Sequence, residues 1–239
     1  MRTFVIHLAR ATARRVQVAH IVASTPDAQV LPACDGAALP EAKRKALYPA
    51  SPLFKPRYPF ALSNGEIGCF ESHKAAWRRI VEENLNAALI VEDDVQIDPA
   101  VFKPALLFAC TQMNDWGYIQ FQVRAVKGSG TMIAENDGCR LVRPDLIPLR
   151  TSAQLVSRRT AARLLEKTEQ IDRPVDTFLQ MRWETGVEVA CAIPSGVSDR
   201  TAEAGGSTLS KKRGLIDEVK VSVPRLRYRS AIKRLSARS

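Results

Sequence analysis

The stretch that decides the fold is Leu62–Val95, which reads LSNGEIGCFESHKAAWRRIVEENLNAALIVEDDV. Ser63 and Glu66 have the spacing of a capping box, so a helix is predicted to start here and to run to about Glu83. Ala87–Val91 is a continuous apolar run of strand length, as expected for a strand covered on both faces in a parallel sheet. A helix followed by such a strand predicts an α/β domain.

The segments on both sides of this stretch continue the alternation of strands and helices. Pro49–Pro59 contains four prolines and is predicted to be a surface loop, and the turn-rich segment Ala125–Pro148 is predicted to be an inserted loop or hairpin. Val187–Ile193 is predicted to close the sheet. The other predicted elements are strands at Thr3–Leu8, Val30–Cys34, Tyr118–Val123 and Ser152–Val156 and helices at Ala11–Ala23, Pro99–Thr111, Arg158–Lys167 and Pro174–Trp183.

The composition fits one domain. With 239 residues and 46% hydrophobic content, the chain can bury a sizeable core, and we expect a single α/β domain with a tail. No run approaches 18 apolar residues, and arginines flank the short apolar run within residues 1–15, so neither a spanning helix nor a signal peptide is expected. The five cysteines are scattered, which favours reduced thiols in the cytoplasm over a disulfide framework or a zinc site.

Most of the net charge of +10 lies in a C-terminal tail. Residues 210–239 hold ten basic and two acidic residues, which leaves the rest nearly neutral, so we divide the chain into a domain at 1–205 and a basic tail at 206–239. Tyr228, Ile232 and Leu235 have helical spacing, so the tail could lie on an anionic membrane surface as an amphipathic helix or remain solvated and disordered. The body has no recognisable nucleic-acid-binding module, and no nucleic-acid partner is expected.

Three acids, Glu92, Asp93 and Asp94, follow the predicted buried strand directly. Like charges this close repel one another, so a compensating group is expected. Ligands of open α/β sheets bind at the carboxyl ends of strands, and Mg²⁺ or Mn²⁺ prefers carboxylate oxygens together with substrate phosphates. Asp93 and Asp94 are therefore the predicted metal ligands. The alternative is that one aspartate caps a turn and that Glu92 pairs with a lysine.

Three motifs in the quoted stretch, G-E-I-G-C, S-H-K and E-D-D-V, stand at separations that closely resemble those of glycosyltransferase family 25. This family includes lipooligosaccharide-biosynthesis enzymes and collagen galactosyltransferases. Ile6-His7-Leu8 resembles the opening I-N-L strand of the family, with histidine in place of asparagine. Ala33–Gly36 resembles its A-x-D-G turn, and Arg173–Asp176 its downstream P-V-D. The likeness spans Phe4–Ile193.

The resemblance implies a Rossmann-like nucleotide-sugar transferase fold of the GT-A type. It also implies a UDP-sugar donor, commonly UDP-galactose, dependence on Mn²⁺ or Mg²⁺, inversion at the anomeric carbon and a lipooligosaccharide or other glycolipid acceptor. Such an enzyme is expected in the cytoplasm, on the inner face of the membrane if the tail binds there. Carried over by position, Asp93 and Asp94 fall on the metal motif. The residues implied near the donor are Ile6, Leu8, Asp35, His73 and Glu92.

Inversion requires a base on the face of the sugar opposite the leaving diphosphate. Asp176 is the first candidate, because it comes from a distant segment and can approach from that side; it could also be a further metal ligand, or an acid in the first turn of a helix beginning at Pro174. Glu66 is the second candidate, although the capping box already explains it. His73 shares a row with apolar residues, so a hydrogen-bonded core position competes with a ligand contact.

Arg14 and Arg15 could reach donor phosphates from the first helix, but surface arginines are common and we rank them low. Three other functions compete with the transferase. One is a non-catalytic member of the fold that binds a nucleotide or glycan. Another is a nucleic-acid-binding protein that uses the basic tail. The third is a two-metal phosphohydrolase, which usually recruits more histidine and aspartate ligands than a chain with three histidines offers.

Overall fold

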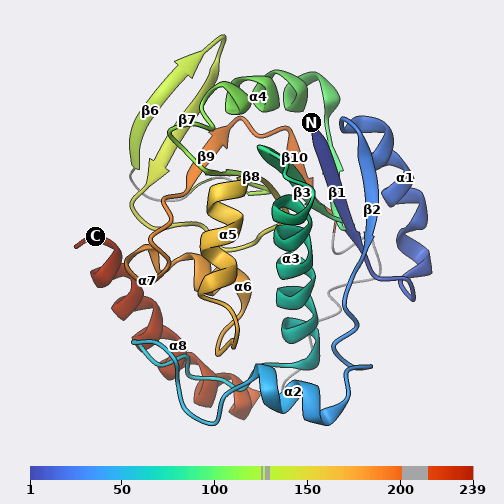
Figure 1. Cartoon of the computed structure of the whole chain (residues 1–239). Coiled ribbons are helices and arrows are strands. Elements are labelled where there is room, and N and C mark those ends of the chain that lie inside the picture. The colour runs from blue at the N-terminus through green and yellow to red at the C-terminus, as the bar shows by residue number, and fades with distance from the viewer. Residues whose placement is uncertain (125, 127–129, 201–214, 239) are drawn as a thin grey trace.

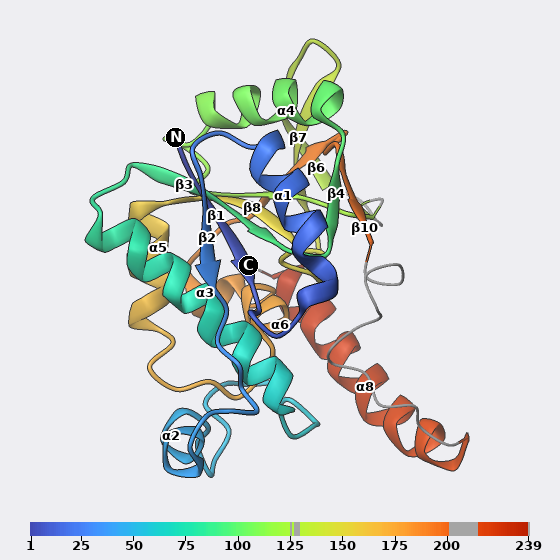
Figure 2. The same ribbon diagram turned by 90° about the vertical axis from the view of Figure 1, so that its right-hand side faces the viewer.

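The computed structural model describes residues 1–124, 126, 130–200 and 215–238. Its centre is an eight-stranded mixed sheet with helices on both faces, which confirms the predicted α/β class (Figures 1 and 2). In sheet order, the strands are β2 (Ala28–Pro32), β1 (Arg2–His7), β3 (Ala87–Glu92), β8 (Ala153–Ser157), β5 (Tyr118–Phe121), β9 (Ala190–Ile193), β7 (Cys139–Pro144) and β6 (Gly130–Asn136).

A two-stranded sheet of β4 (Val95–Ile97) and β10 (Val197–Asp199) extends the region that follows β3. The helices are η1 (Thr12–Arg14), α1 (Arg15–Ser24), α2 (Glu41–Leu47), α3 (Asn64–Glu82), α4 (Pro99–Thr111), α5 (Arg158–Glu166), α6 (Val175–Leu179), α7 (Arg182–Thr185) and α8 (Leu215–Ser236). Pro49–Pro59 forms no helix or strand, as predicted from its prolines.

Alternate residues of the central strands face two separate cores. Phe4 of β1 and Ile90 of β3 belong to the core beneath α3, α5 and α6, whereas Val5 and Val91 belong to the core beneath α1 and α4. This alternation follows from the two-residue period of a strand. Both faces of β3 are therefore apolar, and the strand reads as a continuous apolar run.

Three details of the predicted fold are wrong, two in the sheet and one in a helix. β3 is parallel to β1 but antiparallel to β8, so the sheet is mixed rather than parallel. β9 does not close the sheet, because the hairpin β6–β7 within 125–148 pairs with it and forms the edge. The helix predicted at 174–183 is divided into α6 and α7, since the backbone of Met181 is not helical, with φ −91° and ψ 67°.

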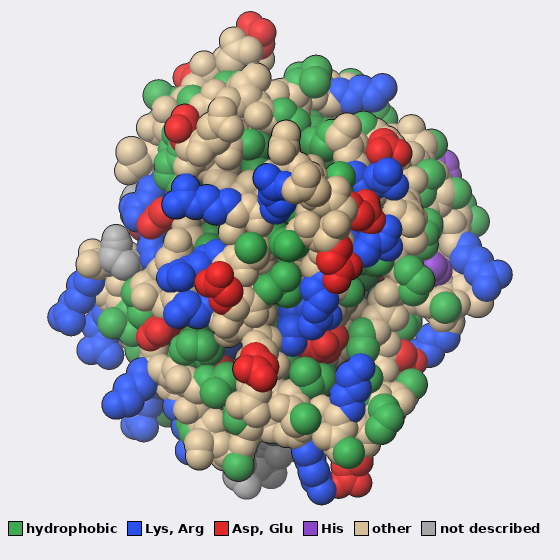
Figure 3. All heavy atoms as spheres, viewed as in Figure 1, with side chains coloured by type: hydrophobic (Ala, Val, Ile, Leu, Met, Phe, Trp, Pro, Cys, Tyr) green, Lys and Arg blue, Asp and Glu red, His purple; other side chains and the backbone are tan. Residues whose placement is uncertain are grey.

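The C-terminal helix α8 packs against the body through its apolar side. Tyr228 is 8% exposed and Ile232 is 1% exposed, and both belong to the core beneath α3 and α5. Lys and Arg side chains gather at the lower left of Figure 3, where α8 lies in Figure 1. The apolar side that was predicted to face a membrane is thus occupied by the protein itself. The boundary at 205/206 lies outside the described residues.

All five cysteines are free, as expected. Within the described part of the chain, no helix is long and apolar enough to span a membrane.

Candidate active site

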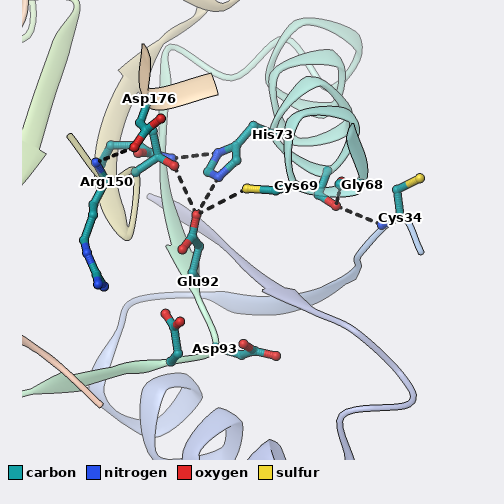
Figure 4. A network of polar contacts seen from close by, with 12 residues as sticks. Cys34, Gly68, Cys69, His73, Glu92, Asp93, Arg150 and Asp176 are labelled. Atoms are coloured by element: carbon teal, nitrogen blue, oxygen red, sulfur yellow. Dashed lines mark hydrogen bonds and ion pairs between the residues drawn. The ribbon is translucent and has the colours of Figure 1, made fainter. Parts of the chain in front are cut away.

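The candidate active site lies where the parallel strands β1 and β3 end. Ile6 is paired in register with Glu92, so the residues that follow, His7 and Asp93, meet at the same edge of the sheet. Glu92 and Asp93 then point to opposite sides of the strand end (Figure 4). The three consecutive acids therefore belong to two different polar networks.

Asp93 is held between a histidine and an arginine. His7 Nδ1 lies 2.7 Å from Asp93 Oδ2, and Arg14 Nη1 lies 2.5 Å from Asp93 Oδ1. Arg14 and Asp93 are 8% and 5% exposed, so this ion pair is largely shielded from water. Both carboxylate oxygens of Asp93 are engaged within the protein, and the repulsion expected among the three acids is compensated here by a cation of the chain itself.

Asp94 lies on the same side of the site as this pair. Arg14 Nη1 is 3.8 Å from Asp94 Oδ2, and the backbone N–H of Arg200 donates to the Asp94 carbonyl at 2.8 Å. Arg14 thus stands beside both aspartates. Its burial and its position next to two acids distinguish it from an exposed arginine such as Arg15, and contact of either arginine with donor phosphates stays a prediction.

Glu92 joins the second network. Its Oε1 atom lies 2.9 Å from His73 Nε2 and accepts from the Thr151 hydroxyl at 3.1 Å, while Gln154 Nε2 lies 3.0 Å from His73 Nδ1 (Figure 4). Burial opposes ionisation of Glu92, but the hydrogen bond and charge of His73, the Thr151 hydroxyl and the charge of Arg150 outweigh it and lower the pKa of this carboxyl.

His73 is fully buried on α3, which fits the hydrogen-bonded core position. Among the described residues, Cys69, His73 and Glu92 also form a compact group of potential metal ligands, with Cys69 Sγ 3.9 Å from Glu92 Oε1. Burial and the nearby negative charges raise the pKa of the Cys69 thiol. The contact of 2.9 Å between His73 Nε2 and Glu92 Oε1 orients the Glu92 carboxylate within this group.

Asp176 approaches the site from α6. Its Oδ2 accepts from the backbone N–H of Arg150 at 3.1 Å, and its Oδ1 accepts from the backbone N–H and hydroxyl of Thr177 at 2.7 and 3.1 Å. Burial raises the pKa of Asp176, these hydrogen bonds counteract part of the rise, and the charge of Glu92 adds to it. Because Thr151 donates to Glu92, residues 150–151 connect the two acids that the sequence places far apart.

Glu66 forms the predicted capping box. Its Oε2 accepts from both the backbone N–H and the hydroxyl of Ser63 at 2.7 Å, and its own N–H donates to the Ser63 hydroxyl at 3.2 Å. These contacts explain the spacing of the two residues without catalysis. A catalytic role for Glu66 stays a prediction.

Asp35 lies beyond the end of β2 and binds Arg10, which follows β1. Arg10 Nε lies 2.6 Å from Asp35 Oδ2, and the hydrogen bond from Arg10 is the main cause that lowers the pKa of Asp35. Leu8 is half-buried nearby, whereas the Ile6 side chain is 7% exposed and belongs to the core. Any contact of Ile6 with a donor would therefore come from its backbone.

Two glycines of the family motifs allow the turn around Asp35 to pack on α3. A Cβ atom at Gly68 would lie 2.5 Å from the Cys34 carbonyl oxygen, and one at Gly36 would lie 1.8 Å from the Asn64 carbonyl oxygen. The backbone N–H of Cys34 also donates to the Ser72 hydroxyl at 2.8 Å. The turn and the helix approach too closely for any larger side chain, which explains why glycine stands at both positions.

The carboxylate oxygens of Asp93 and Asp94 suit a hard divalent cation that also binds a phosphate group of the substrate. Such ions are bound by one or two carboxylates, with water and phosphate oxygens completing the coordination. Asp93 is already held by His7 and Arg14, so Asp94 is the better first ligand and Asp93 the supporting one.

Several residues of the site carried no clear sequence signal. Gln154 lies on β8, the antiparallel neighbour of β3, and Thr151 lies two residues before this strand, so their side chains reach the network only because β8 inserts between β3 and β5. Arg10 lies in an irregular segment. For Arg14, the available sequence signal was its position in the first predicted helix, shortly after the first strand.

Comparison with known proteins identifies the family of the chain. The sequence profile described as "Glycosyltransferase family 25 (LPS biosynthesis protein)" matches residues 1–128. The chain is 33% identical over 126 residues to a "Glycosyltransferase 25 family member" of Anopheles gambiae, covering 49% of this chain and 21% of that protein. It is 27% identical over 195 residues to "Procollagen galactosyltransferase 2" of Homo sapiens, covering 75% and 30%.

A third relative, "Inactive glycosyltransferase 25 family member 3" of Mus musculus, is 35% identical over 96 residues, which cover 39% of this chain and 16% of that protein. The chain spans less than a third of the length of each of these three relatives. The matched profile nevertheless covers the strand β1, the helix α3 and the three acids after β3. The chain therefore belongs to glycosyltransferase family 25.

Proposed function

We propose that the protein is an inverting, metal-dependent glycosyltransferase with a GT-A type fold. It transfers a hexose, with galactose as the first candidate, from a UDP-sugar to a lipooligosaccharide-type glycan. The observation that carries this proposal is the placement of Asp94 beside Arg14 at the end of β3, with a second acid, Asp176 of α6, close enough to this strand end for the charge of Glu92 to act on it.

The donor diphosphate would lie at the carboxyl ends of β1 and β3. Asp94, supported by Asp93, would hold Mn²⁺ or Mg²⁺ there, and the ion would neutralise the charge that grows on the leaving diphosphate. Arg14 adds a positive charge of the chain itself at this position. Arg10 and Asp35, just beyond the ends of β1 and β2, would contact the nucleotide or ribose.

Asp176 would act as the general base. An acceptor hydroxyl attacks the anomeric carbon and gives its proton to Asp176, the bond from that carbon to the diphosphate oxygen breaks, and the configuration inverts. A carboxylate with a raised pKa accepts a proton more readily, and burial is what raises the pKa of Asp176. The hydrogen bonds from Arg150 and Thr177 fix its orientation.

The acceptor and location are supported by less specific evidence. The description of the matched family names an LPS biosynthesis protein, and one relative is named procollagen galactosyltransferase. We propose a glycolipid acceptor, with the enzyme in the cytoplasm and on the inner face of the membrane through the basic side of α8. A non-catalytic member that binds a nucleotide or glycan is the second candidate, because Asp93 is engaged within the protein and one relative is named inactive.

The direct test is UDP release from a panel of UDP-sugars in the presence of Mn²⁺ or of EDTA. The transferase predicts release that prefers one donor and that stops when EDTA removes the metal. Metal-dependent UDP binding without turnover, with every donor and with lipooligosaccharide-derived acceptors present, would favour the binding-only candidate. No binding and no turnover would contradict both.

A further inference from the structure

A cavity of about 560 Å³ lies between the end of α2 and the proline-rich loop 48–61. Its lining includes Tyr48, Tyr58 and Phe60, together with Arg57, Lys45 and Asp172. This volume is within the range of pockets that enclose small organic ligands. The cavity combines aromatic surfaces with two cations and a carboxylate, and none of these residues belongs to the metal or base sites described above.

This lining suits a saccharide. The C–H faces of a sugar ring pack against aromatic rings, while its hydroxyl groups need polar partners at the edges of the cavity. A cavity for an uncharged apolar ligand would not need Arg57, an exposed cation, in its lining, whereas Lys45, which also lines it, is paired with Glu41 at 2.7 Å.

The cavity lies at the end of the molecule where the chemistry is proposed to occur. α2 and α8 lie beyond the carboxyl ends of β1 and β3 in both views (Figures 1 and 2). The ring of Tyr58 packs on Tyr228, and the Tyr228 hydroxyl accepts from Arg173, three residues before Asp176. These contacts connect the cavity wall to the segment that carries Asp176.

Contacts with α8 hold the aromatic wall in place although the loop contains no regular structure. The ring of Tyr58 packs edge-to-face on Tyr228 of α8, with centroids 5.4 Å apart, and on Phe60 at 5.6 Å. The guanidinium of Arg225 lies 5.7 Å from the centre of the Phe60 ring. A wall fixed in this way loses little conformational entropy when a ligand binds.

The base of the loop is anchored by a buried pair. Asp172 accepts from the backbone N–H groups of Leu53 and Phe54 at 2.9 and 3.3 Å. Arg173, which is fully buried, donates to the Phe54 carbonyl at 3.2 Å and to the Tyr228 hydroxyl at 3.0 Å. Loop, α8 and the segment leading to Asp176 are therefore connected by direct contacts.

From this arrangement we propose that the cavity is the acceptor subsite, which binds a hexose unit of the glycan that receives the transferred sugar. This inference rests on the proposed transferase function and adds a binding site for its second substrate. The donor is assigned to the carboxyl ends of β1 and β3, and none of the residues named for it lines the cavity.

Saccharide binding measured by saturation-transfer NMR tests the assignment. The probes are methyl β-galactoside, lactose and the oligosaccharide released from lipooligosaccharide. We expect at least one to bind the wild type and to bind Tyr48→Ala and Arg57→Ala about fivefold more weakly, as expected for loss of about 1 kcal/mol of contact. Lys43→Ala on α2 and Arg78→Ala on α3, both exposed and outside the cavity lining, are the matched controls and should bind as the wild type does.

UDP release from UDP-galactose without an acceptor is measured on the same variants. It distinguishes failure of the acceptor subsite from failure of the proposed transferase function. Cavity variants should retain this release. If the wild type releases no UDP but its saccharide binding still depends on Tyr48 and Arg57, the transferase function is rejected and the cavity remains a glycan-binding site. Failure of all three probes to bind the wild type, equal binding by cavity and control variants, or displacement of the saccharide by UDP would overturn the subsite. Thermal unfolding of each variant verifies that it is folded.

Discussion

The Nδ1 atom of His7 lies 2.7 Å from Oδ2 of Asp93 and connects the end of β1 to the end of β3. Arg14 holds the other oxygen of the same carboxylate. Two groups from the first 14 residues thus fix the acid that precedes Asp94. Where this chain has His7, the family 25 pattern has asparagine. Either side chain can form a hydrogen bond with Asp93.

Arg14→Ala should destabilise the protein by about 3 kcal/mol, because it removes the cation from a buried ion pair and leaves Asp93 with His7 alone. Denaturant unfolding measures the change. Arg15→Ala, at the exposed neighbouring residue, is the control and should have little effect. If the two variants are equally stable, the ion pair does not stabilise this part of the fold.

Activity should depend on pH through Asp176. The base must be ionised to accept a proton, so kcat/KM should fall as the pH decreases through the pKa of Asp176, which burial raises above the ordinary value of about 4. Thr177→Val removes a hydrogen bond to the carboxylate and should move this acidic limb to higher pH. If the fall of kcat/KM at low pH is unchanged in Thr177→Val and still present in Asp176→Asn, Asp176 is not the group responsible for it.

The same raised pKa has a consequence for stability. A carboxyl whose pKa is higher in the folded than in the unfolded protein contributes stability below its unfolded pKa, and this contribution is lost as the pH rises through the folded pKa. Ionised Asp176 therefore opposes folding at neutral pH. This cost fits a residue retained for chemistry rather than for stability.

Gly68→Ala should destabilise the fold by about 1–3 kcal/mol, because its Cβ would meet the backbone of Cys34 and Gly36. Displacing that turn should also weaken UDP binding, since Asp35 lies within it. Gly65→Ala, in the first turn of the same helix, is the control and should be neutral or slightly stabilising through helix propensity. Equal stability and UDP affinity of Gly68→Ala and wild type would show that the turn can move without consequence.

Membrane binding, if it occurs, should be electrostatic. The apolar residues Tyr228 and Ile232 are buried against the body, and the described exposed residues of α8 are mainly basic apart from Val223 and Leu226, so charge should dominate contact with a membrane. The protein should co-sediment with vesicles containing phosphatidylserine at low ionic strength and should be released at high salt. Binding to neutral vesicles, or binding that resists salt, would instead indicate insertion of apolar residues.

Local sequence signals predicted local structure well. The capping box at Ser63 and the Asp98-Pro99 pair mark the starts of α3 and α4 as observed. Strand order was not predictable in the same way, because an apolar run has the same composition whether its neighbour is parallel or antiparallel. The insertion of β8 between β3 and β5 brings Thr151 and Gln154 into the Glu92 network, and no spacing in the sequence encodes that contact.

The sequence also could not separate the roles of the three adjacent acids. Alternation along the strand end sends Glu92 toward His73 and Asp93 toward Arg14, and only the folded positions of those partners show that the two acids belong to different networks. The apolar spacing of the tail predicted a helix. Its packing on the body depends on Arg173 and Tyr58, which are more than 50 residues away in sequence.

The central claim is that Asp94 supports donor cleavage and that Asp176 activates the acceptor. The most direct measurement is Mn²⁺-dependent UDP release from UDP-galactose by the wild type, Asp94→Asn, Asp176→Asn and the exposed control Asp115→Asn, with and without lipooligosaccharide-derived acceptor. We predict that Asp94→Asn loses about 100-fold or more of the release under both conditions, that Asp176→Asn loses mainly the acceptor-stimulated part, and that Asp115→Asn behaves as the wild type. Wild-type rates in a folded Asp94→Asn variant would contradict the account.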